Sequence, residues 1–222
     1  PNVPDSAGYA RQPWWHCVDR EARMLRAQAG IIDISNFAKY RVAGPGAEEW
    51  LNALFANRMP RAIGRSCLTP LIGKRGGIAG DFTVTRLGED EFWVVGSGMA
   101  ERFHQRFFRA IPLPEGTTFQ SLTDACCGFN VAGPQSRNLL GRLTNADLSN
   151  DAFPFMRSQR IVVAGIECVA IRVSFTGDLG WELHCATEDQ IALYAALIEA
   201  GRDFGAGPVG GRALMSLRVE KG

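Results

Sequence analysis

KRGGIAGDFTVTRLGEDEFWVVGS, residues 74–97, is the stretch that decides the fold. Apolar and polar residues alternate over 78–87, and 91–97 is rich in strand-forming residues. Gly88-Glu89-Asp90 between them is a turn signal, so the stretch predicts an antiparallel hairpin. Because similar strand-like runs are interspersed with helical segments along the chain, we expect an α+β fold of antiparallel sheets with packed helices.

Further elements are expected on both sides of this hairpin. Strands are predicted over 38–44, 128–133 and 180–186, and residues 160–175 predict a second hairpin that turns at Ala164-Gly165. Helices are predicted over 19–30, 46–57 and 100–110, after Pro134, and up to Gly201, the last with a capping-box pattern of Thr187 and Gln190. A mild break near 112–127 predicts two parts, residues 1–120 and 121–222, which we expect to exchange segments.

Composition excludes several classes of function. The 222 residues are 46% hydrophobic and 21% charged with a net charge of +1, which is typical of a globular protein. Basic blocks interleaved with aromatic residues are absent, so no nucleic-acid partner is expected. No apolar run approaches the roughly 20 residues of a membrane span, and the N-terminal stretch lacks the apolar core of a signal peptide. The last residues, SLRVEKG, are expected to be a truncation within a structured region.

The cysteines predict no metal site. None forms a Cys-x-x-Cys pair, and no spacing of zinc ligands occurs. We expect them to be reduced thiols, several of them in the core, in a reducing compartment such as the bacterial cytoplasm. The six are Cys17, Cys67, Cys126, Cys127, Cys168 and Cys185.

Asp81 directly follows a glycine at the entrance of the first hairpin strand. Three nearby glycines let the backbone adopt shapes that side chains forbid, and they let a ligand approach the main chain. Strand alternation places Asp81 on one face with Thr83 and Thr85. Two interpretations remain open: a turn or edge residue, or a carboxylate presented to a ligand.

Glu182 lies in SFTGDLGWEL, residues 174–183, where a turn leads into a strand. Its neighbours Trp181 and Leu183 are apolar, so the carboxylate faces away from them. It is either a solvated outer-face residue or a ligand-binding one. The three histidines lie in unrelated contexts: we expect His104 to face solvent, and His184 to share the face of Glu182 only through a bulge. Neither a nucleophile elbow nor a dinucleotide fingerprint occurs.

Four motifs in order resemble the aminomethyltransferase family, whose type member is the T-protein of the glycine cleavage system. They are GGIAGDFTVTRL (76–87), FNVAGPQS (129–136), VSFTGDLGWEL (173–183) and GGRALMSLRVEKG (210–222). The chain is especially similar, from about residue 14 to 222, to the tetrahydrofolate-binding portion of dimethylglycine and sarcosine dehydrogenases. The resemblance implies the family's folate-binding fold without its small C-terminal barrel, which would follow Gly222.

The resemblance implies an enzyme that passes a one-carbon (methylene) unit from an N-methyl amine such as dimethylglycine or sarcosine to tetrahydrofolate. It places Asp81 near the reacting folate nitrogens, as the catalytic carboxylate, and Glu182 at the pterin ring. Leu68, Phe175 and Arg212 are the other expected folate-binding positions. FAD is expected only in a separate N-terminal domain or a partner subunit, and the compartment would be the mitochondrial matrix in a eukaryote.

The chain departs from several T-proteins at three positions. Leu68 and Phe175 replace tyrosines that lie thirteen residues before the aspartate and seven before the glutamate, and Leu214 replaces an arginine. These departures favour a dehydrogenase-type relative over a glycine-cleavage T-protein. Two alternatives stay open: a flavin-independent, tetrahydrofolate-dependent S- or O-demethylase, and a non-catalytic folate-binding module.

Overall fold

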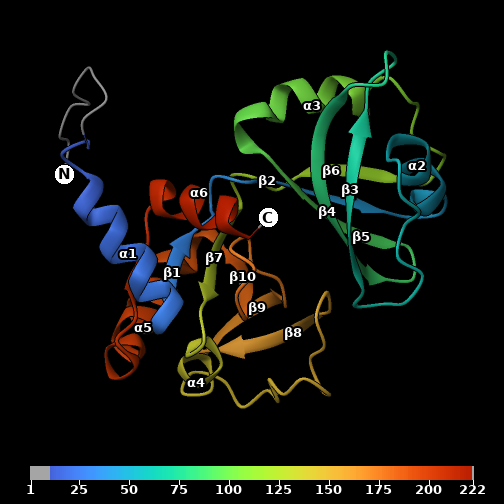
Figure 1. The fold of residues 1–222 in the computed structure, drawn as a ribbon. Helices are drawn as coiled ribbons and strands as arrows, with labels where there is room; N and C mark the ends of the chain where they lie inside the picture. Colours follow the sequence, from blue (N-terminus) through green and yellow to red (C-terminus); the bar gives the residue numbers. More distant parts are fainter. Residues whose placement is uncertain (1–10, 222) are drawn as a thin grey trace.

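Two antiparallel sheets form the framework of the computed structural model, which describes residues 11–221 (Figure 1). The five-stranded sheet has the order β3 (Ser66–Ile72), β4 (Ile78–Gly88), β5 (Glu91–Gly96), β2 (Ala38–Ala43) and β6 (Thr118–Ser121). The six-stranded sheet has the order β11 (Gly207–Pro208), β1 (Gly30–Asp33), β7 (Cys126–Ala132), β10 (Gly180–Ala186), β9 (Ile166–Ile171) and β8 (Ser158–Val163). Among the strands within residues 11–221, only β1 and β11 pair in parallel. The expected α+β class is confirmed.

Helices α2 (Ala47–Leu54) and α3 (Glu101–Phe108) cover one face of the five-stranded sheet. Phe82 and Val84 of β4 point into the core beneath these helices, as their alternation with Asp81 and Thr83 predicts. The short 3-10 helix η1 (Gly98–Ala100) leads into α3. An aromatic cluster fills this core, made of Tyr40, Trp50, Phe55, Phe82, Phe108 and Phe119.

Helices α4 (Ser136–Leu140) and α5 (Gln190–Gly201) cover one face of the six-stranded sheet. Leu139, Leu193 and Leu197 pack there against alternate residues of β7 and β10, such as Phe129 and Trp181. Helices α1 (Trp15–Ala27) and α6 (Gly211–Glu220) lie side by side near β1 and contribute to a separate apolar cluster (Figure 1). The remaining 3-10 helices are η2 (Thr187–Asp189) and η3 (Arg202–Phe204).

The chain crosses between the sheets twice. It leaves β1 in the six-stranded sheet, enters β2 in the five-stranded sheet, and returns from β6 to β7. The predicted boundary between residues 120 and 121 falls within β6, just before the return crossing. β1 belongs to the six-stranded sheet although it lies in the first half. The division into two domains stays a prediction.

Both predicted hairpins occur where expected. The turn between β8 and β9 places Ala164 at φ 51° and Gly165 at φ 82°, and a positive φ at both residues is what a two-residue type I′ hairpin loop requires. The prediction of a capping box was wrong, because neither of its side chains caps α5. Instead, the Thr187 hydroxyl donates to the Asp124 carbonyl, and the Gln190 amide donates to the Ser35 hydroxyl. The helix expected after Pro134 is α4, which spans only five residues, so Leu143 lies beyond its end.

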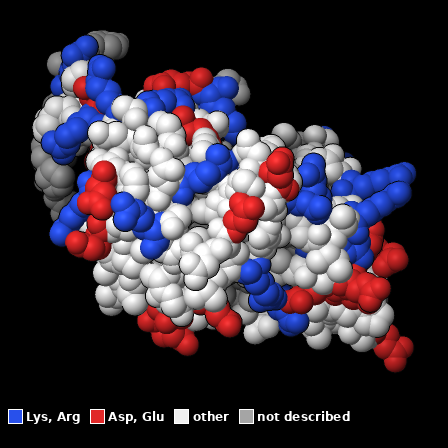
Figure 2. Space-filling model, turned by 90° about the horizontal axis from the view of Figure 1, so that it is seen from below, with Lys and Arg blue, Asp and Glu red and all other residues white. Residues whose placement is uncertain are grey.

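All six cysteines are free thiols, and Cys127, Cys168 and Cys185 are buried. Burial raises the pKa of Cys127 to about 12, which keeps this thiol protonated and unreactive at neutral pH. Figure 2 shows acidic and basic side chains interspersed on the face that it presents. No helix within residues 11–221 is long and apolar enough to cross a membrane.

Phe82→Ala is expected to lower the free energy of unfolding by about 3–5 kcal/mol, because the ring is 2% exposed and contacts Phe55, His104 and Phe108. Phe103→Ala is the matched control, since this ring is 46% exposed and should cost less than about 1 kcal/mol. Urea denaturation measures both. Equal losses would show that the side chains of β4 do not form the core described here.

Candidate functional site

The candidate site lies between the two sheets, where their inner faces meet. We use inner face for the side of each sheet that turns away from α2 and α3, or from α4 and α5. On the five-stranded sheet Thr83 and Thr85 pair with Val95 and Trp93, and cross-strand partners share a face. Trp93 reaches the other sheet, with its ring centroid 5.8 Å from that of His184. The inner faces are therefore in direct contact.

Glu182 is the central residue of the opposite inner face. It pairs with Asn130 of β7 and Ile171 of β9, and it is only 8% exposed. The alternative of a solvated outer-face carboxylate was therefore wrong, because the second sheet and helices cover this face. Within residues 11–221 no lysine or arginine forms an ion pair with Glu182. A buried carboxylate without a cation is costly, so this position favours a ligand that brings hydrogen-bond donors.

His184 is the one basic side chain within 4 Å of the Glu182 carboxylate in the described chain, with Nε2 3.5 Å from Oε2. We expected the two to share a face only through a bulge, and that was wrong. The register of β10 against β7 is continuous from Gly180 to Ala186, and residues two apart in a strand share a face. His184 is 2% exposed, and neither ring nitrogen has a hydrogen-bond partner.

Two more buried polar atoms near Glu182 lack partners. The Asn130 side-chain oxygen and the Trp93 indole nitrogen have none, although the Asn130 amide nitrogen donates to the Val173 carbonyl at 3.2 Å. Buried polar groups are nearly always paired, so such a concentration is typical of a ligand site or bound water. A ligand that carries both N–H groups and a carbonyl would complement donors and acceptors of this kind.

Asp81 lies on the inner face of the five-stranded sheet and is exposed. Its cross-strand partner is Pro70, and Leu68 occupies the next position on that face, paired with Thr83 and 58% exposed. Asp81 is thus within β4, not in a turn. The two carboxylates predicted as site residues, Asp81 and Glu182, therefore lie on facing sheets, one on each.

His104 supports the backbone before Asp81. We expected it to face solvent, but it is 1% exposed, because α3 turns it inward onto Phe82. Its Nε2 donates to the Ala79 carbonyl at 3.2 Å, and a Cβ on Gly80 would lie 2.5 Å from the same nitrogen. Burial lowers the pKa of His104, although the Ala79 hydrogen bond and the charge of Asp81 oppose the shift. The glycine before Asp81 thus makes room for an imidazole.

Two other predicted site residues lie near α6. The half-buried Phe175 stands in the segment before β10, with the Arg218 guanidinium 5.6 Å from its ring centroid. Arg212 is exposed and its guanidinium lies 4.0 Å over the Trp14 ring, so it joins α6 to α1. The arginine beside Phe175 is thus Arg218, which was not among the site residues predicted from the sequence.

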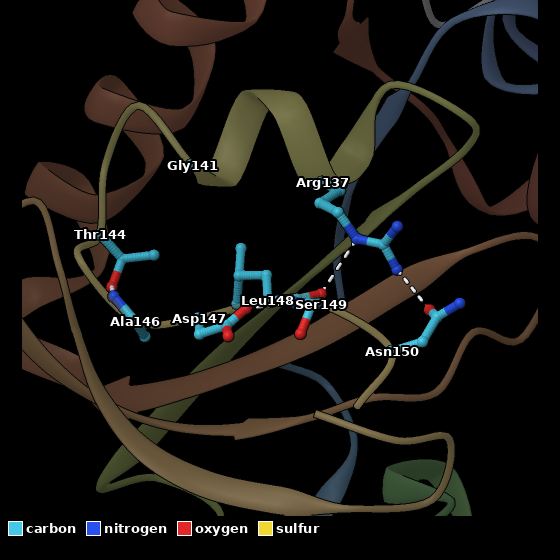
Figure 3. A pocket seen from close by; sticks show the side chains of 8 residues that line it. All are labelled: Arg137, Gly141, Thr144, Ala146, Asp147, Leu148, Ser149 and Asn150. Atoms are coloured by element: carbon cyan, nitrogen blue, oxygen red, sulfur yellow. Dashed lines mark hydrogen bonds between the residues drawn. The ribbon is translucent and has the colours of Figure 1, made fainter. Parts of the chain in front are cut away.

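Three surface cavities lie away from both carboxylates. One, of about 420 Å³, is lined by residues from Arg137 to Asn150 (Figure 3). Arg137 donates there to the Leu148 carbonyl at 2.9 Å and to the Asn150 side chain at 2.6 Å, so it serves to hold the loop. The other two, of about 450 and 510 Å³, lie beside α2 and at the β8–β9 turn. In residues 11–221 no group of three potential metal ligands occurs.

Residues 3–222 match the family described as GCVT N-terminal domain. The chain belongs to this family. It is 34% identical over 215 residues to dimethylglycine dehydrogenase of Mus musculus, covering 96% of this chain and 25% of that protein. It is 33% identical to 4-methylaminobutanoate oxidase (formaldehyde-forming) of Paenarthrobacter nicotinovorans, over 96% of this chain and 26% of that protein.

The fold agrees with this assignment. Aminomethyltransferase T of the Bartonella henselae glycine cleavage system superposes with a TM-score of 0.79 at 25% identity, over 97% of this chain and 58% of that one. The GCVT-type chain thus has the aminomethyltransferase fold and is related to dimethylglycine dehydrogenases. It spans about a quarter of the length of the dehydrogenase and oxidase relatives.

Gly80→Ala tests the contact behind Asp81. The new methyl group would press on His104 Nε2 and the Phe82 ring, and overpacking of this kind costs about 1–3 kcal/mol of unfolding free energy. In a His104→Ala background most of that cost should disappear, because the imidazole is gone. A double-mutant cycle from urea denaturation compares the cost of Gly80→Ala in the wild type and in the His104→Ala background. If the two substitutions lower the free energy of unfolding additively, the described contact between residue 80 and His104 is contradicted.

Glu182→Leu is expected to stabilise the ligand-free protein by about 1 kcal/mol or more, because it removes a buried carboxylate that has no cation. Glu167→Leu on the neighbouring strand β9 is the control, since this carboxylate is exposed and should change stability by less than about 0.5 kcal/mol. Thermal unfolding without ligand compares them. A clear loss of stability for Glu182→Leu would mean that the carboxylate has a structural role.

Proposed function

We propose that this chain is the tetrahydrofolate-binding, one-carbon-transferring domain of an enzyme that oxidises an N-methylated amino acid. The observation that carries the proposal is Glu182, a buried carboxylate that has no lysine or arginine partner within residues 11–221, on an inner face that meets the one carrying Asp81. Both residues lie in motifs of a family in which aminomethyltransferases occur.

The class of one-carbon donor follows from the relatives. Dimethylglycine and 4-methylaminobutanoate, after which two of them are named, are both amino acids with a methylated nitrogen. We propose a donor of this class, such as dimethylglycine or sarcosine. Oxidation of the donor would need FAD in a separate domain or subunit, which agrees with the small share of each relative that this chain spans. A reducing compartment, the cytoplasm or the mitochondrial matrix, suits the free thiols.

The residues of this chain have distinct proposed roles. Glu182 accepts hydrogen bonds from the pterin N–H groups, and such charge-assisted bonds are stronger than neutral ones. Asp81 stabilises positive charge that develops on a folate amine during transfer, and it is placed to accept a proton. Leu68 and Phe175 offer apolar surface, and Arg212 a positive charge, to the rest of the ligand. Tetrahydrofolate, when bound, supplies the nitrogen atoms that take up the one-carbon unit.

Titration with reduced tetrahydrofolate, followed by tryptophan fluorescence, tests the proposal. We expect saturable binding that Asp81→Ala and Glu182→Ala each weaken tenfold or more, which corresponds to about 1.4 kcal/mol. Asp90→Ala is the matched control, because this exposed carboxylate lies in the β4–β5 turn of the same sheet and should leave the affinity unchanged.

Two outcomes would contradict the proposal. Binding that survives both substitutions would place the ligand away from these carboxylates. Absence of binding both by this chain and by a longer form that includes the C-terminal barrel would exclude a folate site, and with it the one-carbon function.

A further inference from the structure

The geometry points to His184 as a positioning residue that holds the Glu182 carboxylate toward its ligand by donating a hydrogen bond from Nε2. This inference rests on the proposed function and adds a residue to its site. The observation behind it is the 3.5 Å contact between His184 Nε2 and Glu182 Oε2, on adjacent positions of one strand face.

The contact determines which nitrogen of His184 carries a proton. A bare Nε2 would direct its lone pair at a carboxylate oxygen, which repels it, whereas an N–H at that place attracts it. At 3.5 Å the contact is longer than an ordinary hydrogen bond, and contacts of this kind in ligand-free sites commonly shorten when the ligand binds. A free carboxylate on a strand would otherwise sample several rotamers.

The surroundings hold the imidazole in place without competing for its proton. Trp93 of the five-stranded sheet packs against the ring at an interplanar angle of 55°. On the other side Gly128 leaves the necessary space, since a Cβ there would lie 2.9 Å from Nδ1. No described residue hydrogen-bonds either ring nitrogen, so Glu182 is the acceptor that Nε2 can reach.

A structural role and a positioning role predict different results for His184→Leu. A histidine whose ring nitrogens are buried and unpaired adds little stability, so Leu should leave the free energy of unfolding unchanged or raise it. If His184 positions Glu182, the same substitution weakens the binding of tetrahydrofolate about tenfold, within the usual range for contacting residues. His184→Gln, whose amide nitrogen can replace Nε2–H, should restore most of the affinity.

A double-mutant cycle with Glu182→Ala makes the test specific, because this variant leaves no side-chain oxygen to accept a hydrogen bond. In that background His184→Leu should cause no further loss of affinity, because the two residues act as one unit. Cys185→Ala is the control: this neighbouring side chain points into the opposite core, so the variant should lose stability but keep its affinity. Independent losses from His184→Leu and Glu182→Ala would overturn the inference while leaving the proposed function intact.

A second measurement needs no ligand. Nitrogen-15 NMR of the imidazole in the ligand-free protein should show a proton on Nε2 of His184, with a change in the side-chain carboxyl carbon signal of Glu182 in His184→Leu. A neutral ring protonated on Nδ1 alone would overturn the inference even if the protein binds folate. If neither this chain nor the longer form binds folate, the proposed function fails, and the NMR result still decides whether His184 donates to Glu182.

Discussion

The relative placement of the two sheets depends on one buried ammonium group. Lys39 is fully buried at the start of β2, and its Nζ donates to the carbonyls of Ser35 and Phe37, each at 2.9 Å. Burial lowers the pKa of this group, and the two carbonyls offset part of the cost by accepting hydrogen bonds from its N–H groups. The segment that it holds is the crossing from β1 to β2.

The return crossing is attached to the same residue. The Lys39 backbone N–H donates to the Thr123 hydroxyl at 3.1 Å, and its carbonyl accepts the Leu122 N–H at 2.8 Å. Both passages between the sheets therefore run side by side. A third connection joins the far edge, where Ser66 N–H donates to the Met156 carbonyl and Ser158 N–H to the Gly64 carbonyl. These attachments keep the inner faces opposed, so that polar residues can be buried between them without a continuous apolar core.

Local pattern was enough to predict many of the elements, although not β3 or α6, and it did not show how the sheets meet. Alternation gave the faces of Asp81 and Glu182 correctly, and the Ala164-Gly165 turn was evident from its residues. The short strands β1, β6 and β11 have too few residues for a periodic signal, and their pairing depends on contacts distant in the chain. The burial of Glu182 could not be foreseen, because one strand does not reveal that a second sheet covers it. His184 could have been found, since residues two apart in a strand share a face.

The division of the candidate site between two sheets has an energetic consequence. Direct apolar contact across the inner faces is small: its buried members are Trp93, Val95 and Ile171. The hydrogen-bonded crossings therefore contribute to the orientation of the sheets, and Asp81 and Glu182 are positioned by different sheets. A ligand that contacts both carboxylates would add a connection between the sheets and supply further donors to their oxygens. Because it would bind the folded chain and not the unfolded one, its binding free energy would also stabilise the fold. The cost of burying Glu182 and the affinity proposed for a ligand there would therefore have one physical origin, a carboxylate that is only 8% exposed.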